Sequence, residues 1–258
     1  MSQPQLDRPY FDYQRRRRSH WDAAARLLDR GKRSWGSYYH RRLAEIYRGA
    51  VQPGASVLEI GCGEGDLLAA VNPSYGLGID FSREMLKRAK TKHPGLHFCL
   101  GDAHEGFLDG KKFDFIILSD LLNDAWDVQA VFANLAELCH PGTRIILNTY
   151  SRLWELPLLA AEKLQLARPV LYQNWLTVED ARILMRYGGF EIVRTWHEIL
   201  SPLPIPLLTG LSNRYLARLA PLNQLCLSNF IIGRRYPVPQ RKDNPSVSII
   251  VPARNEAG

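Results

Sequence analysis

The stretch Val57-Leu58-Glu59-Ile60-Gly61-Cys62-Gly63-Glu64-Gly65 decides the fold of this 258-residue chain. A short apolar run enters a turn with a glycine at every second position, which predicts a buried strand followed by a tight turn into a helix. Glycines at such a turn let the backbone approach a nucleotide-like ligand closely. The next apolar run ends at Asp80. A carboxylate at that strand tip is placed to accept hydrogen bonds from a ribose, so the stretch predicts a cofactor-binding unit.

Short apolar runs alternate with amphipathic stretches along the chain, which is typical of an α/β fold with a mostly parallel sheet and helices on both faces. A turn is predicted at Pro141-Gly142, and Ser82 and Thr177 are predicted N-caps. Helices are predicted at 65–71, 82–92, 128–138 and 177–185. Strands are predicted at 57–60, 76–79, 97–100, 113–118, 144–148, 190–195 and 227–233.

The net charge of +7 lies in an N-terminal arm that is predicted to be helical. Residues 1–48 contain 12 Lys/Arg and 5 Asp/Glu, so the difference, +7, equals the charge of the whole chain. The run Arg15–Arg18 could contact nucleic acid phosphates or an anionic membrane, or form a solvated charged face. No aromatic or glycine-rich RNA-binding pattern accompanies it, so we expect no nucleic acid partner and favour the solvated face.

The four cysteines, Cys62, Cys99, Cys139 and Cys226, are far apart and form no C-x-x-C pair. Their spacing excludes the usual zinc frameworks and gives no disulfide scaffold, so we expect no metal site and a reducing compartment. No run of 18 apolar residues is present, and no membrane span is predicted. These features predict a cytoplasmic protein with, at most, peripheral membrane contact through the basic arm.

The charges around the glycine turn distinguish between cofactors. Gly61, Gly63 and Gly65 are spaced G-x-G-x-G, whereas a dinucleotide site uses G-x-G-x-x-G. Glu59 precedes the first glycine, where a carboxylate disfavours a pyrophosphate and suits an ammonium and a sulfonium. Asp102, in the step Gly101-Asp102-Ala103 after the third strand, is placed to meet an adenine amino group.

With these signals in place, residues 56–150 resemble the class I S-adenosylmethionine-dependent methyltransferases, and the domain is expected over about 49–235. The resemblance also covers the strand Phe-Asp-Phe-Ile-Ile-Leu-Ser-Asp and the turn Pro-Gly-Thr-Arg. It implies a seven-stranded sheet whose last strand is antiparallel, S-adenosylmethionine as cofactor, and methyl transfer to a small-molecule acceptor.

The resemblance also implies roles for individual residues. The turn and Glu59 are expected at the methionine end of the cofactor, Asp80 at the ribose, and Phe81 beside the adenine. Asp102 and Ala103 are expected at the adenine edge, and Ser119 and Asp120 on the methionine and acceptor side. The expected cofactor-binding set is therefore Glu59, Gly61, Cys62, Gly63, Gly65, Asp80, Phe81, Asp102, Ala103 and Ser119.

No catalytic base is identified by the sequence. Many relatives carry a histidine after the fourth strand, but this chain has Ser119-Asp120-Leu121-Leu122-Asn123-Asp124 there. Asp120, His104 and Tyr150 are weak candidates, and Asn123 and His197 are possible acceptor contacts. Aromatic residues of the arm either close over the cofactor or pack a helix on the sheet; they are Trp21, Trp35, Tyr38 and Tyr39.

Two segments depart from the alternation. Residues 201–225, between the last two strands, are an insertion that serves as an acceptor cover, as an amphipathic contact element, or as part of the core. Residues 236–245 are a proline-rich linker, and 246–258 resemble the first strand of inverting GT-A glycosyltransferases. That resemblance implies a bifunctional protein with a following glycosyltransferase domain and a sugar, glycolipid or polyprenyl-linked acceptor.

Two other function classes stay open at this point. A non-catalytic module of the same fold would dock or regulate the glycosyltransferase. A nicotinamide-dependent oxidoreductase shares Asp80 but requires the longer glycine spacing and no charge at Glu59.

Overall fold

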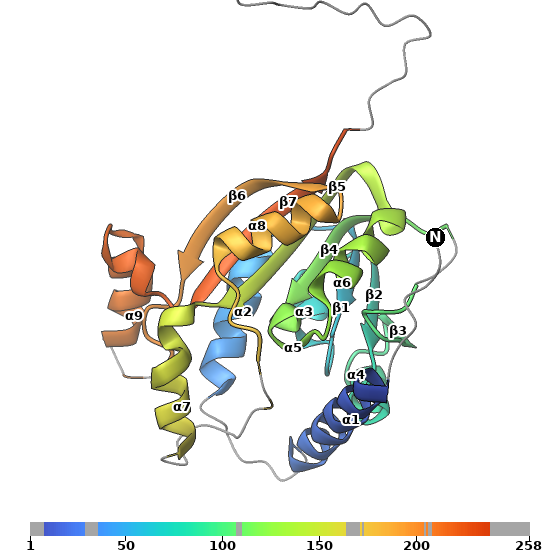
Figure 1. Cartoon of the computed structure of the whole chain (residues 1–258), viewed down its shortest axis with the longest axis horizontal. Helices are drawn as coiled ribbons and strands as arrows, with labels where there is room; N and C mark the ends of the chain where they lie inside the picture. The colour runs from blue at the N-terminus through green and yellow to red at the C-terminus, as the bar shows by residue number, and fades with distance from the viewer. Residues whose placement is uncertain are drawn as a thin grey trace, which may run out of the picture.

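The computed structural model describes residues 8–28, 36–106, 110–163, 171, 173–203, 205 and 208–237. One seven-stranded sheet runs through the molecule in the order β3-β2-β1-β4-β5-β7-β6 (Figure 1). The strands β1 to β5 are parallel, and β7 is antiparallel to both β5 and β6, which confirms the predicted fold class. The strands are β1 (Ser56–Ile60), β2 (Tyr75–Asp80), β3 (His97–Leu100), β4 (Phe113–Ser119), β5 (Cys139–Tyr150), β6 (Phe190–Glu198) and β7 (Ser228–Arg235).

Helices cover both faces of the sheet. On one face α6 and α8 pack against the strands, and on the other α2, α3 and α4 do so. The α-helices are α1 (Arg8–Leu28), α2 (Gly36–Ala50), α3 (Asp66–Ala70), α4 (Arg83–Lys92), α5 (Leu121–Asp124), α6 (Val128–Leu135), α7 (Glu155–Lys163), α8 (Val178–Tyr187) and α9 (Leu208–Arg214). Short 3₁₀ helices are η1 (Ala136–Leu138), η2 (Arg152–Trp154), η3 (Leu216–Arg218) and η4 (Leu222–Leu225).

The apolar run of β1 fills both layers of the core because successive side chains of a strand point to opposite faces. Leu58 and Ile60 belong to the core layer under α6 and α8, whereas Val57 belongs to the layer under α2. All three side chains are at most 1% exposed. Burying a side chain of this size contributes about 1.5–3 kcal/mol to stability, so this short strand stabilises the sheet strongly.

The predicted turn at Pro141-Gly142 was wrong. Residues 139–150 form one strand, and its pairing with β4 passes from Phe113–Cys139 directly to Phe115–Arg144. The extra residues make an irregular bulge in β5. The side chain of Thr143 hydrogen-bonds to the backbone where the pairing of β4 and β5 is interrupted. Its Oγ1 accepts from His140 N at 2.8 Å and donates to Phe113 O at 2.6 Å. Side-chain hydrogen bonding therefore lets a proline and a glycine remain within a strand.

Two N-terminal helices border the carboxyl ends of the parallel strands, the edge where α/β proteins bind ligands. Helix α1 lies across this edge and packs on α4 (Figure 1). Helix α2 is part of the core, since Tyr39, Leu43 and Tyr47 are buried at helical spacing against the sheet. It runs through Ala50, past the expected end of the arm at residue 48.

Candidate functional site

The three glycines of the turn after β1 all have left-handed backbone conformations, with φ of +76°, +51° and +76° for Gly61, Gly63 and Gly65. A Cβ on Gly65 would lie 2.7 Å from the Phe98 ring, so this position also needs glycine for packing. A Cβ on Gly63 would meet nothing within 4 Å. Gly63 therefore presents bare backbone to open space, as a turn that cradles a ligand requires.

Asp80 at the end of β2 ties this turn to the neighbouring strand. Its Oδ2 accepts a hydrogen bond from Gly63 N and its Oδ1 accepts one from Ser82 N, both at 2.8 Å. Burial raises the pKa of Asp80, and these backbone N–H groups partly offset the rise by favouring the charged form. The carboxylate thus holds the turn in its bent shape in addition to facing the cavity.

Asp102, after β3, is held by His104, two residues further along the chain. Its Oδ1 accepts hydrogen bonds from His104 N at 3.0 Å and from His104 Nδ1 at 2.6 Å. Burial raises the pKa of Asp102, but the bonds from His104 outweigh it and lower the pKa overall. His104 Nε2 in turn accepts from the backbone N–H groups of Trp126 and Asp127, so both ring nitrogens are engaged.

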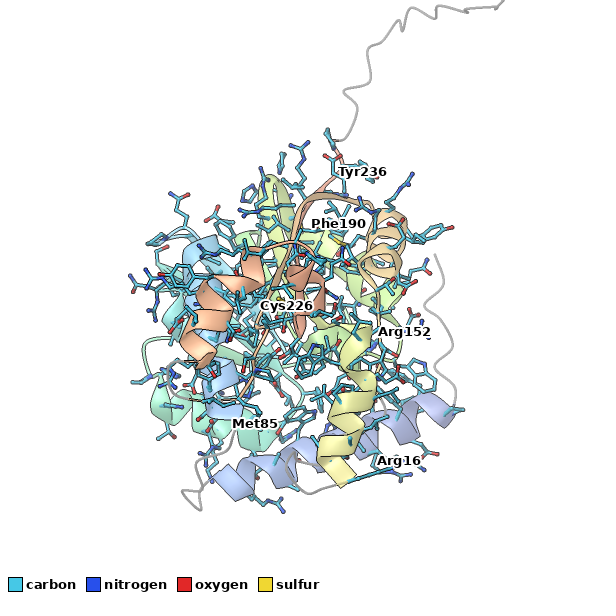
Figure 2. The ribbon with its side chains drawn as sticks, turned by 90° about the vertical axis from the view of Figure 1, so that its left-hand side faces the viewer. Arg16, Met85, Arg152, Phe190, Cys226 and Tyr236 are labelled. Carbon is cyan, nitrogen blue, oxygen red and sulfur yellow. The ribbon has the colours of Figure 1, made fainter. Side chains whose placement is uncertain are left out.

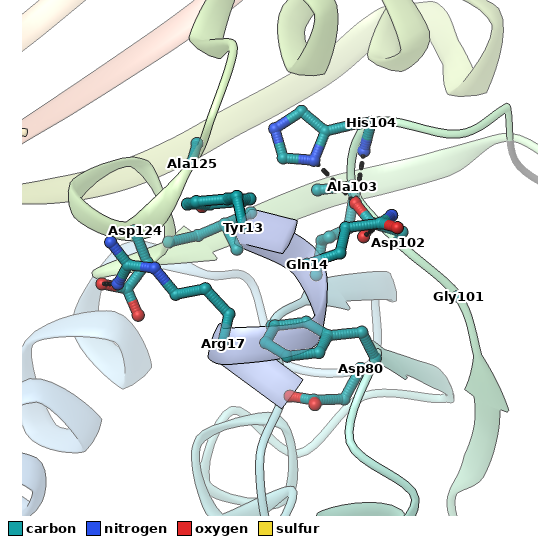
Figure 3. Close-up of a pocket in the computed structure, with 14 residues that line it drawn as sticks. Tyr13, Gln14, Arg17, Asp80, Gly101, Asp102, Ala103, His104, Asp124 and Ala125 are labelled. Carbon is teal, nitrogen blue, oxygen red and sulfur yellow. Dashed lines mark hydrogen bonds and ion pairs between the residues drawn. The ribbon is translucent and has the colours of Figure 1, made fainter. Parts of the chain in front are cut away.

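Helix α1 closes this region. Figure 3 shows Tyr13, Gln14 and Arg17 of α1 at a cavity bordered by Asp80 and Asp102. The helix is tethered by an Arg17–Asp124 ion pair and by hydrogen bonds from Gln14 to Asp102, from Trp21 to Asp124 and from Ser82 to Asp22. The volume of this cavity is about 30 Å³, room for about two water molecules. Ligand sites span roughly 300–1,000 Å³, so this cavity in its present shape is too small for a nucleoside.

The cavity brings together five of the expected cofactor residues, namely Gly61, Asp80, Phe81, Asp102 and Ala103. Glu59 lies beneath the turn at 2% exposure, and its Oε2 has no hydrogen-bond partner among the described residues. Burial raises the pKa of Glu59 well above its ordinary value. Asp80, Asp102 and Asp124 line the cavity, and their carboxylate oxygens are hydrogen-bond acceptors that suit a cationic ligand with ribose hydroxyls. A pyrophosphate would face like charges there.

A second polar group lies where β4 ends, centred on Asp120. Tyr39 OH donates to Asp120 Oδ1 at 2.9 Å and to Oδ2 at 3.1 Å, and Asn148 Nδ2 donates to Oδ1 at 2.5 Å. Asn148 Oδ1 accepts from Tyr47 OH at 2.7 Å and from Ser119 Oγ at 3.1 Å. We call these five residues the Asp120 network.

Asp120 is a half-buried residue with φ +54° at the start of α5. Burial raises its pKa to about 7, even though the bonds from Tyr39 and Asn148 favour the charged form. A carboxyl group with this pKa exchanges protons near neutral pH, the property required of a general base.

The other predicted residues are distributed around this network. The Tyr150 ring packs between Tyr39 and Trp175, with centroids 5.9 and 6.3 Å away. Asn123 is buried, and its Nδ2 is unpartnered among the described residues. His197 bonds to Asn229 on the neighbouring strand. Trp35 lies outside the described residues.

The arm carries site residues that sequence reasoning missed. Arg17 is 6% exposed, while its neighbours in the run are exposed; the run is therefore not a uniform solvated face. Tyr13, Gln14, Tyr47 and Asn148 were also missed. The i, i+4, i+8 spacing of Tyr39, Leu43 and Tyr47 was the one available signal, because it marks a buried helix face.

Comparison with known proteins identifies the family. Residues 52–198 match the family model described as a methyltransferase domain, which is more than half of the chain. The chain belongs to this methyltransferase family. S-adenosylmethionine is the methyl donor, and the enzyme class is that of S-adenosylmethionine-dependent methyltransferases. The matched residues include the glycine turn, Asp80, Asp102 and Asp120, but neither α1 nor α2.

Curated relatives of this methyltransferase match it over its central part. A phthiotriol/phenolphthiotriol dimycocerosates methyltransferase of Mycobacterium tuberculosis is 27% identical over 127 residues, covering 47% of this chain and 46% of the relative. A ubiquinone biosynthesis O-methyltransferase of Coxiella burnetii is 29% identical over 118 residues, covering 43% and 50%. The chain thus spans about half the length of the curated relatives it matches.

A solved structure has the same fold. The S-adenosylmethionine-dependent methyltransferase of Mesorhizobium loti superposes with a TM-score of 0.56 at 23% identity, covering 74% of this chain and 98% of that one. At this identity the likeness concerns the fold alone.

Proposed function

We propose that this methyltransferase methylates a hydroxyl group of a small-molecule acceptor, with Asp120 as the general base. The observation that supports this most is the Asp120 network: a carboxyl group whose burial raises its pKa to about 7 at the carboxyl end of β4. A hydroxyl loses its proton on methylation, so a positioned base of this pKa suits oxygen acceptors. The Coxiella burnetii relative is named as an O-methyltransferase.

The proposed cofactor residues are the glycine turn with Glu59, Cys62 and Ser119 at the methionine end, and Asp80, Phe81, Asp102 and Ala103 at the adenosine end. When bound, S-adenosylmethionine supplies an electrophilic methyl group on a sulfonium. The unpartnered Oε2 of Glu59 and the surrounding carboxyl groups are acceptors that suit its positive charge and its hydroxyls.

Asp120 then takes the proton that leaves the acceptor oxygen as the oxygen–methyl bond forms. A hydrogen bond from Tyr39 OH shared between the two carboxyl oxygens, and one from Asn148 Nδ2, hold the Asp120 carboxyl group in a fixed orientation before the reaction. The tightly packed rings of Tyr39, Tyr150 and Trp175 next to it form an aromatic wall that suits a flat or ring-shaped acceptor. In this scheme His104 positions Asp102, and Tyr150 contacts the acceptor without exchanging its proton.

The glycan-related acceptor remains a prediction with its own test. It depends on residues 246–258, which lie outside the described residues and outside the family match, as does the predicted glycosyltransferase domain. The non-catalytic alternative also remains, and the Asp120 network disfavours it because a docking module needs no base of neutral pKa.

The decisive experiment is transfer of a labelled methyl group from S-adenosylmethionine to two acceptor panels, phenolic or catecholic compounds and sugar-bearing lipids, by wild type and Asp120→Asn. We expect transfer to a hydroxyl of the first panel, with kcat/KM rising as pH passes about 7. The substitution should reduce the rate by about 10²–10⁴-fold. Calorimetry should show that Asp120→Asn still binds S-adenosylmethionine. An unchanged rate and pH profile in the variant would remove Asp120 as the base.

A further inference from the structure

An apolar surface covers the side of the molecule formed by η2, α7 and the 201–225 insertion. Figure 2 faces this side: the helix that follows Arg152 and the segment around Cys226 both lie toward the viewer. Nine large apolar side chains there are 41–76% exposed. We call them the apolar face: Leu153, Leu156, Leu159, Leu203, Ile205, Leu211, Tyr215, Leu219 and Leu225.

The elements of the apolar face are joined to one another. Trp154 Nε1 donates a hydrogen bond to Leu225 O at 2.9 Å, which links η2 to η4. Helix α9 packs on η3, and η3 on η4. Asn213, buried beneath them, donates to Ser201 O at 2.8 Å and accepts from Ser201 N at 2.9 Å. The elements that carry the apolar face are thus held together by buried hydrogen bonds of Asn213, while its leucines are exposed.

This arrangement is costly for a protein that stays in water. Monomeric soluble proteins rarely expose apolar patches larger than a few hundred Å², and larger ones mark interaction sites. The exposed leucines of the apolar face come from both η2–α7 and the insertion, so they are not isolated surface residues. A partner surface is therefore expected.

The charged residues of the insertion are all positive, which favours an anionic partner. Residues 199–227 contain Arg214 and Arg218 and no Asp or Glu. Both arginines are exposed, as is Arg152 beside them in η2. Helix α7 adds Lys163, which is exposed, and Glu155 and Glu162, which are partly exposed. Leucines and a tyrosine surrounded by exposed cations are the pattern of elements that lie in the interface of an anionic bilayer.

We propose that the apolar face docks this protein on an anionic phospholipid bilayer. No helix of the described residues is long and apolar enough to cross a membrane, so the contact is interfacial. The contact differs from the one expected through the Arg15–Arg18 run. Within that run Arg17 is buried against Asp124, and Arg15 pairs with Asp12.

Docking would place the site near the lipid surface. Tyr150, which packs on Tyr39 of the Asp120 network, is followed directly by Ser151 and η2. Asn213 of α9 bonds to Tyr38, the neighbour of Tyr39, at 2.9 Å. The apolar face therefore borders the acceptor side of the site.

The test is flotation of the full 258-residue chain with vesicles of 70% phosphatidylcholine and 30% phosphatidylglycerol, and with pure phosphatidylcholine vesicles. We expect binding to the anionic vesicles that weakens with added salt. The triple variant Leu156→Ser/Leu211→Ser/Tyr215→Ser should bind about tenfold or more weakly. Arg214→Glu/Arg218→Glu should bring anionic binding down to the level seen with neutral vesicles.

A matched control carries three exposed apolar residues outside the apolar face, Ile183→Ser/Tyr187→Ser/Val193→Ser, with exposures of 45, 74 and 52%. It should bind like wild type, and circular dichroism should show all variants folded. Absence of vesicle binding by wild type, or equal loss in the control, would overturn the proposal. So would a dimer in light scattering that the Leu156 triple variant abolishes, because a second copy would then cover the apolar face.

Discussion

Gln14 Nε2 of α1 donates a hydrogen bond to Asp102 Oδ2 at 2.8 Å, joining residues 88 positions apart. An amide N–H group of the protein thus occupies the acceptor that the family resemblance reserves for the adenine edge. Together with the Arg17–Asp124 ion pair, this contact holds α1 across the site and leaves about 30 Å³ of space. We infer that the helix acts as a lid, and we expect cofactor exchange to require these contacts to break.

Arg17→Ala should speed both association and dissociation of S-adenosylmethionine. Removing a hydrogen bond to a charged group lowers stability by about 1.5–3 kcal/mol, so the lid should open about tenfold or more often. Stopped-flow tryptophan fluorescence measures both rates, because Trp21 lies on α1 and bonds to Asp124. Arg15→Ala, which removes an exposed pair with Asp12, is the control and should leave both rates unchanged. If the Arg17 variant exchanges cofactor at the wild-type rate, α1 is not the barrier.

Asp80→Ala should weaken cofactor binding and stability together. The substitution removes the acceptor for Gly63 N and Ser82 N and leaves these groups without their partner. We expect a loss of roughly 1–3 kcal/mol in the free energy of unfolding and at least a tenfold weaker affinity for S-adenosylmethionine. Urea denaturation and calorimetry measure the two effects. Glu179→Ala, in an exposed pair with Arg182, should change neither.

A substitution at Gly63 should affect cofactor affinity much more than stability. Gly63→Ala places a side chain at φ +51°, which costs about 1 kcal/mol, and fills the open side of the turn. We expect a small fall in Tm and a large fall in cofactor affinity. Gly54→Ala is a matched control, since Gly54 has φ +76° and nothing within 4 Å of its Cβ position, yet lies outside the site. Equal affinities in the two variants would show that the open side of Gly63 is not used.

The contribution of Asp120 to the stability of the protein should fall as pH rises from about 4 to about 7. Asp120 has a folded pKa of about 7, above the value near 3.9 of an unfolded chain, so the folded state binds more protons in this window. The raised pKa values of Glu59 and Asp80 act in the same direction. The difference in the free energy of unfolding between wild type and Asp120→Asn isolates the contribution of Asp120. We expect this difference to change by on the order of 1 kcal/mol or more with pH. Urea denaturation at pH 5 and pH 8 measures it, and a difference that is constant with pH would contradict the raised pKa.

Local patterns were enough to predict the sheet, because strands, helix caps and glycine turns depend on neighbours in the chain. The alternation of short apolar runs with amphipathic stretches predicted a mostly parallel sheet, and the resemblance to class I methyltransferases implied the antiparallel last strand. The structure confirms both. Asp80 and Asp102 were predicted at strand ends, and the parallel sheet brings them to one edge. The turn at Pro141-Gly142 failed because a tertiary hydrogen bond, from Thr143 to Phe113, overrode a local signal.

Only the tertiary structure decided how α1 covers the cavity and what surrounds Asp120. Arg17 meets Asp124 across 107 residues, and Tyr39 meets Asp120 across 81. Such pairs depend on how α1 and α2 pack on the sheet. The spacing of Tyr39, Leu43 and Tyr47 marks a buried face of α2, but it does not say which strand end that face meets. The pKa of Asp120 likewise comes from the burial that these contacts create. By itself the sequence determined the fold and the cofactor edge, whereas the lid, the proposed base and the apolar face required the folded chain.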